Sequence, residues 1–170
     1  ALQAQQLARA GGSADLPDAA TRLRVGIDGA ARHLRGVVHA LMPAALVERG
    51  LTAAIEDLVD RMPLPTRLAV AEVDGRLPAT VERTAYFVVA EALTNAVKHA
   101  RAEKVTVTLE RAPTRLVIGV TDDGVGGATQ EGGAGLHGLA DRVDALGGRF
   151  AVDSPAGGGT RLLVELPCGS

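Results

Sequence analysis

The hydrophobic pattern of residues 1–43 has a helical period. Apolar side chains recur at alternating steps of three and four residues, a heptad rhythm that favours a helix packed in a coiled-coil-like bundle: Ala20, Leu23, Ile27, Ala30, Leu34, Val37 and Leu41. Residues 2–10 are typical of the end of another helix, and Gly11, Gly12 and Pro17 mark its stop and turn. The segment predicts a helical hairpin; the alternative is two surface helices packed on the neighbouring domain.

Beyond Pro43 the pattern alternates between helical and strand periods. The predicted helices are a short one from Leu51 to Met62, a long one over 79–100 and one over 136–146. The predicted strands are 66–73, 104–110, 115–121, 149–153 and 160–166. Within 104–110 the apolar side chains Val105, Val107 and Leu109 face inward and the threonines face outward. Such alternation requires only one covered sheet face. We therefore predict an α+β fold with helices on one face of a mixed sheet over residues 44–170, preceded by the hairpin of residues 1–43.

Composition limits the classes of partner. The 170 residues suit one domain with an appendage, and a hydrophobic content of 46% is enough for a core. Aromatic residues make up only 2%, with no Trp, which argues against base-stacking platforms. The net charge of −2 comes from 18 basic and 20 acidic residues that are interspersed, so no basic stripe is available for a phosphate backbone. We expect protein partners and no nucleic acid.

Cysteine usage and hydropathy favour a cytoplasmic setting. Cys168 is the one cysteine, so no intrachain disulfide can form, which is compatible with a reducing compartment. No apolar run approaches the roughly 20 residues that a membrane-spanning helix needs. We expect a cytoplasmic protein, or the cytoplasmic part of a membrane-anchored one.

Two segments carry the candidate chemistry. In the predicted helix 79–100, Glu91, Asn95 and Lys98 follow the spacing i, i+4, i+7, which places them within roughly 60° on one face. This polar stripe borders the apolar face instead of lying opposite it, as a solvated stripe would. The second segment, Asp122 to Gly127, puts two acids and three glycines directly after a predicted strand.

These segments resemble, in order, the conserved boxes of bacterial sensor histidine kinases. Residues 91–100 are similar to the N box and 122–127 to the G1 box. Residues 133–143 are similar to the G2 box, and Gly157 to Thr160 to the closing Gly-Thr strand. The family belongs to the gyrase, chaperone, kinase and mismatch-repair ATPase superfamily with the Bergerat fold. The Arg-rich helix ending at Pro43, followed by Gly50 and Leu51, resembles the dimerisation hairpin of the nitrate and membrane-fluidity sensor subgroup.

The resemblance implies ATP and Mg²⁺ as ligands. Asn95 is expected to bind the magnesium ion, because a neutral amide does not repel the triphosphate. Glu91 is expected to orient a water molecule on that ion or to assist proton transfer. Lys98 and His99 are expected to face the phosphates, although the position of His99 is equally compatible with packing beside the apolar face.

The resemblance also implies the adenine pocket and the lid. Asp122 is expected to accept a hydrogen bond from the adenine amino group, with Gly124 and Gly126 letting the backbone turn close to the base. Asp123 is interpreted as a turn residue. Thr160 is expected to place its hydroxyl near the adenine. The alternative is that threonine occurs here only because it is common at the start of strands. The lid is expected over Thr129 to Ala134, covering the phosphates, and the helix N-terminus after Gly135 is expected to offer them free amide groups. Gly133, Gly135 and Leu136 are the residues expected to bind ATP there.

The function that the resemblance implies is phosphoryl transfer. The γ-phosphate of ATP passes to a histidine of the hairpin in a homodimer and then to a response regulator. The Arg/Glu-rich stretch ending His-Asp that carries the acceptor in this subgroup is absent, and His33 and His39 have no acidic residue after them. We therefore expect a fragment without its phosphoacceptor. Two alternatives remain: a serine kinase of the anti-sigma-factor type, and an ATP-gated interaction module.

Overall fold

The computed structural model describes residues 43–71, 73, 76–129 and 134–169. All of them lie in the compact unit Met42–Ser170. The predicted hairpin and its histidines lie outside the described residues, so the domain boundary at residue 43 stays a prediction. None of the helices in the described part of the chain is long and apolar enough to cross a bilayer.

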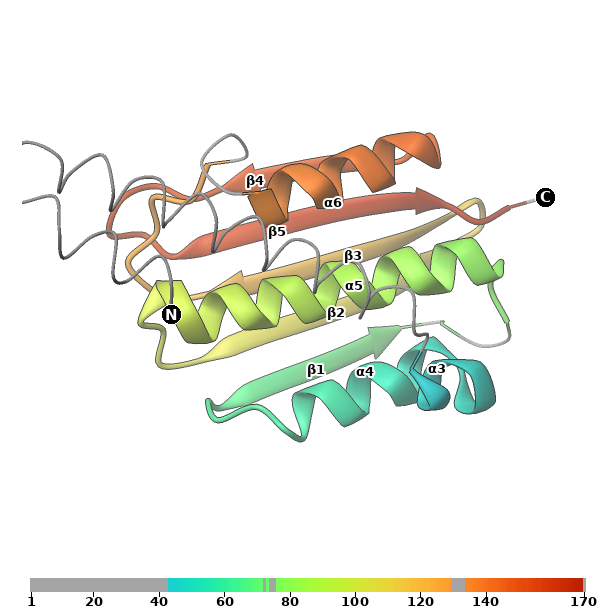
Figure 1. Ribbon diagram of the computed structural model, residues 1–170, viewed down its shortest axis with the longest axis horizontal. Coiled ribbons are helices and arrows are strands. Elements are labelled where there is room, and N and C mark those ends of the chain that lie inside the picture. Colours follow the sequence, from blue (N-terminus) through green and yellow to red (C-terminus); the bar gives the residue numbers. More distant parts are fainter. Residues whose placement is uncertain (1–42, 72, 74–75, 130–133, 170) are drawn as a thin grey trace, which may run out of the picture. The chain divides into compact units, whose positions relative to one another are not determined.

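The described unit is one mixed sheet with helices against one of its faces (Figure 1). The helices are α3 (Ala44–Arg49), α4 (Leu51–Val59), α5 (Ala79–Asn95), the π turn η1 (Ala96–Ala100) and α6 (Ala134–Ala145). The strands are β1 (Thr66–Ala71), β2 (Val105–Ala112), β3 (Arg115–Asp122), β4 (Arg149–Asp153) and β5 (Thr160–Pro167). Their order is β1-β2-β3-β5-β4, with β1 parallel to β2 and the other pairs antiparallel. The predicted fold class is confirmed.

The core lies between the helix layer and the inner face of the sheet. In β2, Val105, Val107 and Leu109 are buried, whereas Thr108 is exposed, as the alternation predicted. Helices α4, α5 and α6 all contact strands, and Figure 1 shows them in front of the sheet. Each fully buried Val or Leu contributes about 1.5–3 kcal/mol of transfer free energy, so this single layer carries most of the stabilisation.

Two local features differ from the predicted pattern. The helix over 79–100 has the predicted length, but its last five residues form the π turn η1 instead of a continued α-helix. In addition, α3 forms directly after Pro43, where no helix is predicted, because six residues are too few for a period to be recognised.

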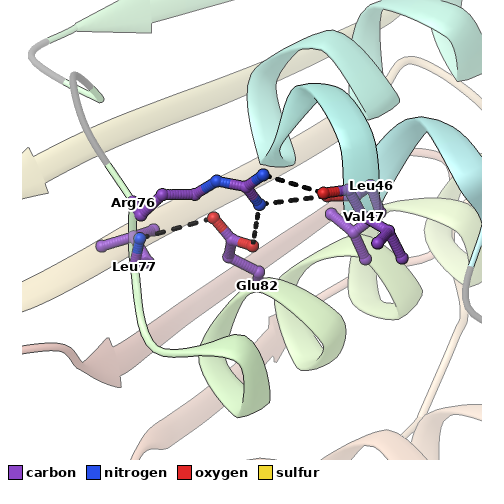
Figure 2. Close-up of polar contacts among 5 residues, drawn as sticks. All are labelled: Leu46, Val47, Arg76, Leu77 and Glu82. Carbon is purple, nitrogen blue, oxygen red and sulfur yellow. Dashed lines mark hydrogen bonds and ion pairs between the residues drawn. The ribbon is translucent and has the colours of Figure 1, made fainter.

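A buried carboxylate connects α3 to the beginning of α5 (Figure 2). Glu82, in the first turn of α5, is 4% exposed. Its carboxylate accepts a hydrogen bond from the Leu77 amide at 3.4 Å and pairs with Nη1 of Arg76 at 3.4 Å. The same guanidinium donates to the carbonyl oxygens of Leu46 at 3.4 Å and Val47 at 2.8 Å, near the end of α3. Arg76 and Glu82, the α3–α5 clamp, therefore hold two helices together.

Candidate functional site

A cavity of about 370 Å³ lies between the helix layer and the sheet. The helices contribute Ala92, Asn95, His99, Ala100 and Leu136 to its lining. The sheet contributes Val120, Asp122, Val152, Thr160 and Leu162, and the loop after β3 contributes residues 126–129. Apolar strand side chains and a few polar groups thus share one concave site, which is the usual make-up of a small-molecule pocket.

The acid that is predicted to hydrogen-bond to the adenine lies at the end of β3. Asp122 is paired in register with Thr160, the first residue of β5, so the two side chains occupy the same sheet face at neighbouring positions. Oδ1 of Asp122 accepts a hydrogen bond from the Gly124 amide at 2.9 Å. The other carboxylate oxygen can accept a hydrogen bond from a ligand.

The glycines after Asp122 are required by close backbone contacts. A Cβ on Gly124 would lie 2.2 Å from the carbonyl oxygen of Ala100, the last residue of η1. Gly126 has φ 63°, and a Cβ there would lie 2.0 Å from the carbonyl oxygen of Pro155. The loop therefore packs between η1 and the β4–β5 turn, which a side chain at either position would prevent.

The π turn explains which polar residues of the long helix line the cavity. A π turn advances by roughly 80° per residue instead of roughly 100°. Relative to Asn95, this difference moves Lys98 from roughly 60° to roughly 120° around the helix axis, whereas His99 stays within roughly 40° in either geometry. Accordingly Asn95 and His99 line the cavity and Lys98 does not, although the side chains of His99 and Lys98 are both exposed.

Glu91 lies one turn before Asn95, beside the beginning of α6. A Cβ on Gly135 would be 2.1 Å from Oε1 of Glu91, so the absence of a side chain at Gly135 makes room for this carboxylate. Neither Glu91 nor Gly135 lines the cavity, although the next residue, Leu136, does. Gly133 lies outside the described residues. The catalytic role of Glu91 stays a prediction.

Asp123 has a structural place, as its interpretation as a turn residue predicted. Its Oδ1 accepts hydrogen bonds from the amides of Glu103 at 2.9 Å and Lys104 at 3.0 Å, in the segment before β2. These backbone hydrogen bonds, that of Lys104 first, lower the pKa of the Asp123 carboxyl below its ordinary 3.8. Asp122 therefore lines the cavity, whereas the adjacent Asp123 holds the backbone before β2.

The residue that sequence reasoning missed is Ser154. It follows β4 and its hydroxyl oxygen lies within hydrogen-bond distance of the Ala128 amide, the Gly159 carbonyl and the Thr160 hydroxyl. The sequence carries one signal for it, a serine between a strand and Pro155, but that pattern is equally typical of an ordinary turn.

The cavity fits a metal ion that arrives with its nucleotide. Among the described residues no group of three or more His, Cys, Asp or Glu side chains is placed to hold a metal ion. Asn95 offers one amide oxygen on the cavity wall. Mg²⁺ usually keeps several water molecules and takes substrate phosphates with only one or two protein oxygens, so a single amide oxygen on the wall is compatible with it.

Residues 80–170 match the family model of the histidine kinase-, DNA gyrase B- and HSP90-like ATPases. This range is more than half of the chain and contains every residue that lines the cavity. The chain belongs to this family. Within it, the described unit is an ATP-binding catalytic domain of the histidine kinase type.

Individual relatives agree with this assignment. The chain is 37% identical over 154 residues to the histidine-protein kinase/phosphatase UhpB of Salmonella typhimurium, with 86% of this chain and 30% of that protein covered. It is 32% identical over 155 residues to the sensor histidine kinase NarS of Mycobacterium tuberculosis, covering 86% and 36%. The ATP-binding domain of PrrB from Mycobacterium tuberculosis superposes with a TM-score of 0.52 at 25% identity, covering 71% and 92%. The chain thus spans about a third of the two curated relatives.

Proposed function

We propose that this chain binds ATP with Mg²⁺ in the cavity and catalyses transfer of the γ-phosphate to a histidine, as the catalytic part of a two-component sensor kinase. The observation that carries the proposal is the convergence of Asp122, Thr160, Asn95 and His99 on one cavity. The first pair lies at the end of the sheet and the second on the long helix, so base-binding and phosphate-binding groups come from opposite layers.

Adenine is placed against the sheet. Val120, Val152 and Leu162 supply apolar contact area, and Asp122 supplies the acceptor that an exocyclic amino group requires. The triphosphate is then directed toward Asn95 and His99 and toward the N-terminus of the 12-residue α6, whose free amide groups attract anions. Lys98, which is exposed and does not line the cavity, adds positive charge only through the general field at this end of the helix.

Asn95 would hold the magnesium ion, which when bound neutralises charge on the phosphates. Catalysis by the chain's own residues is then mostly positioning: the cavity fixes the nucleotide, and Glu91, one helical turn away, orients a water molecule or assists proton transfer. Transfer is accelerated mainly because the nucleotide is held in the correct geometry, and not through a covalent step by the residues of the cavity.

The acceptor histidine, the homodimer and the response regulator belong to the whole protein. The match with the Salmonella kinase covers 86% of this chain, more than residues 44–170 alone amount to, so part of the segment before residue 44 is shared with a kinase. This supports the proposal that residues 1–43 form a dimerisation hairpin; membership of the nitrate and membrane-fluidity sensor subgroup rests on the sequence resemblance alone. We place the domain in the cytoplasm, where ATP and response regulators occur.

The test of nucleotide binding is calorimetric titration with ADP and Mg²⁺. Asp122→Asn presents a donor where the adenine amino group requires an acceptor, and an unpaired buried polar group costs about 1–3 kcal/mol, or about 5- to 150-fold in affinity. Asp123→Asn is the matched control, because it changes the adjacent acid, which does not line the cavity. Equal ADP affinity of a folded Asp122→Asn variant and wild type would show that the base lies elsewhere.

The test of phosphoryl transfer uses radiolabelled ATP and a full kinase hairpin supplied in trans. We expect no histidine phosphorylation of the isolated chain and acid-labile label on the supplied hairpin. Acid-stable label would favour the serine kinase alternative, and nucleotide binding with no transfer would favour the interaction module. Acid-labile phosphate on His33 or His39 would contradict the fragment interpretation.

A further inference from the structure

The hydroxyl of Ser154 connects the loop after β3 to the beginning of β5. Its Oγ lies 3.0 Å from the amide nitrogen of Ala128, 3.2 Å from the carbonyl oxygen of Gly159 and 3.0 Å from Oγ1 of Thr160. Ala128 and Thr160 both line the cavity, while Ser154 itself does not. Ser154 is half-buried, so bulk water has restricted access to replace these hydrogen bonds.

The three neighbours determine the direction of each hydrogen bond. The Ala128 amide can only donate, and the Gly159 carbonyl can only accept. Ser154 has a single hydroxyl hydrogen, which satisfies the buried Gly159 carbonyl. The hydrogen bond between Ser154 and Thr160 must then be donated by Thr160. All three groups around Ser154 are satisfied only in this arrangement.

The consequence is that Thr160 has no hydroxyl hydrogen left for a ligand. Its oxygen retains a lone pair and can act toward the cavity only as an acceptor. Directly across the β3–β5 pair lies Asp122, whose carboxylate is also an acceptor. The end of the sheet therefore presents two acceptors and suits a base that presents hydrogen-bond donors.

We propose that Ser154 is a positioning residue that fixes the Thr160 hydroxyl as an acceptor and thereby adds selectivity for a purine with a 6-amino group. The inference rests on the proposed nucleotide site and deepens it. Without the Ser154 hydroxyl, the Thr160 hydroxyl rotates freely and offers donor and acceptor alike, so its contribution to selection of the amino group is lost.

Ser154 also has a structural role, which the experiment has to separate, because its hydroxyl accepts a hydrogen bond from the Ala128 amide in the loop after β3. The neighbouring hydrogen bond from the Gly127 amide goes to the backbone carbonyl of Ser154 and does not depend on the side chain. Loosening of this loop weakens every nucleotide alike. A change in hydroxyl direction weakens only ligands that carry the 6-amino group. The ratio of two affinities therefore distinguishes the roles.

The experiment measures affinities for ADP and for the diphosphate of unsubstituted purine riboside, which lacks the 6-amino group. In wild type ADP binds more tightly. In Ser154→Ala we expect ADP affinity to fall about 3- to 10-fold more than the affinity of the purine analogue, the effect of one hydrogen bond on the ratio. Ser154→Thr keeps the hydroxyl and should retain the wild-type ratio. Thr160→Val should lower the ratio alone, and adding Ser154→Ala to it should lower it no further.

Equal losses for both nucleotides in Ser154→Ala would overturn the proposal, since only the loop would then depend on Ser154. Unchanged ADP affinity would overturn it as well. Should Ser154→Ala not fold, Ser154→Cys gives the same ratio test, because a thiol keeps the volume but forms weaker hydrogen bonds. Failure of the proposed function is distinguishable: wild type would then not bind ADP, or Asp122→Asn would bind it normally.

Discussion

The two ends of the long helix show when a polar side chain is structural and when it is available to a ligand. At the first turn of α5, Glu82 is buried and its partners Arg76 and Leu77 are part of the protein. At the other end, Asn95 and His99 face a cavity. Both ends carry charged or amide groups in one helix. Whether a polar group stabilises the fold or is available to a ligand therefore depends on its environment and not on its residue type.

Asn95→Ala should have the largest effect, and it should be confined to function. Loss of the only protein ligand that we assign to the magnesium ion should slow phosphoryl transfer to a supplied hairpin by more than about 100-fold, since even outer-shell changes at metal sites cost 10- to 100-fold. The midpoint of urea unfolding should not move. Transfer by a folded variant at the wild-type rate would refute the role of Asn95.

Arg76→Ala should affect stability and leave the cavity intact. Removing one partner of a fully buried ion pair costs about 3–5 kcal/mol, but the Arg76 side chain is 58% exposed, so water can replace part of the interaction. We expect a loss of about 1–2 kcal/mol in the free energy of unfolding, measured in urea, with unchanged ADP affinity. Arg83→Ala is the control, because Arg83 follows Glu82 in α5 but its side chain is exposed. Weakened ADP binding would mean that the two ends of α5 are coupled.

His99 and Lys98 test the π turn directly. His99→Ala should weaken ADP about 3- to 10-fold because the side chain lines the cavity. Lys98→Ala should weaken it less than about twofold, with an effect that disappears in salt, because an exposed lysine acts only through screened charge. Titration calorimetry at two salt concentrations makes the measurement. A loss of affinity for Lys98→Ala that is as large as that for His99→Ala and persists in salt would indicate that Lys98 faces the nucleotide, as it would in a continuous α-helix to residue 100.

Asp123 should give the smallest effect, visible only in acid. Because backbone hydrogen bonds lower its pKa below 3.8 in the folded state, its contribution to stability is present above that pH and is lost as pH falls through the folded value. The free energy of unfolding of wild type should therefore decrease more steeply below about pH 4 than that of Asp123→Asn. Urea unfolding at a series of pH values measures both slopes, and parallel slopes would contradict the shift.

The sequence predicted what depends on local period. The alternation of Val105, Val107 and Leu109 correctly predicted the inner face of β2. Of the polar stripe, Asn95 lines the cavity, whereas Glu91 and Lys98 do not. The π turn was missed because it is a change in the backbone hydrogen-bond pattern, and the residue types of this segment are equally compatible with an α-helix. Ser154 was missed because its importance arises from three neighbours that the fold brings together, one of which lies 26 positions away.

The position of Asp122 and Thr160 in the sheet has a consequence for dynamics. They belong to β3 and β5, which have a neighbouring strand on both sides, although Thr160 itself precedes the pairing with β4 and is paired only with Asp122. Amides in interior strands exchange with solvent mainly through global unfolding, so the parts of β3 and β5 next to these two residues should be among the slowest of the described residues in hydrogen exchange. The groups that meet the base are then rigid before a nucleotide arrives. The conformational entropy lost on binding is then mainly that of the nucleotide and of the residues at the rim of the cavity, and not that of the sheet.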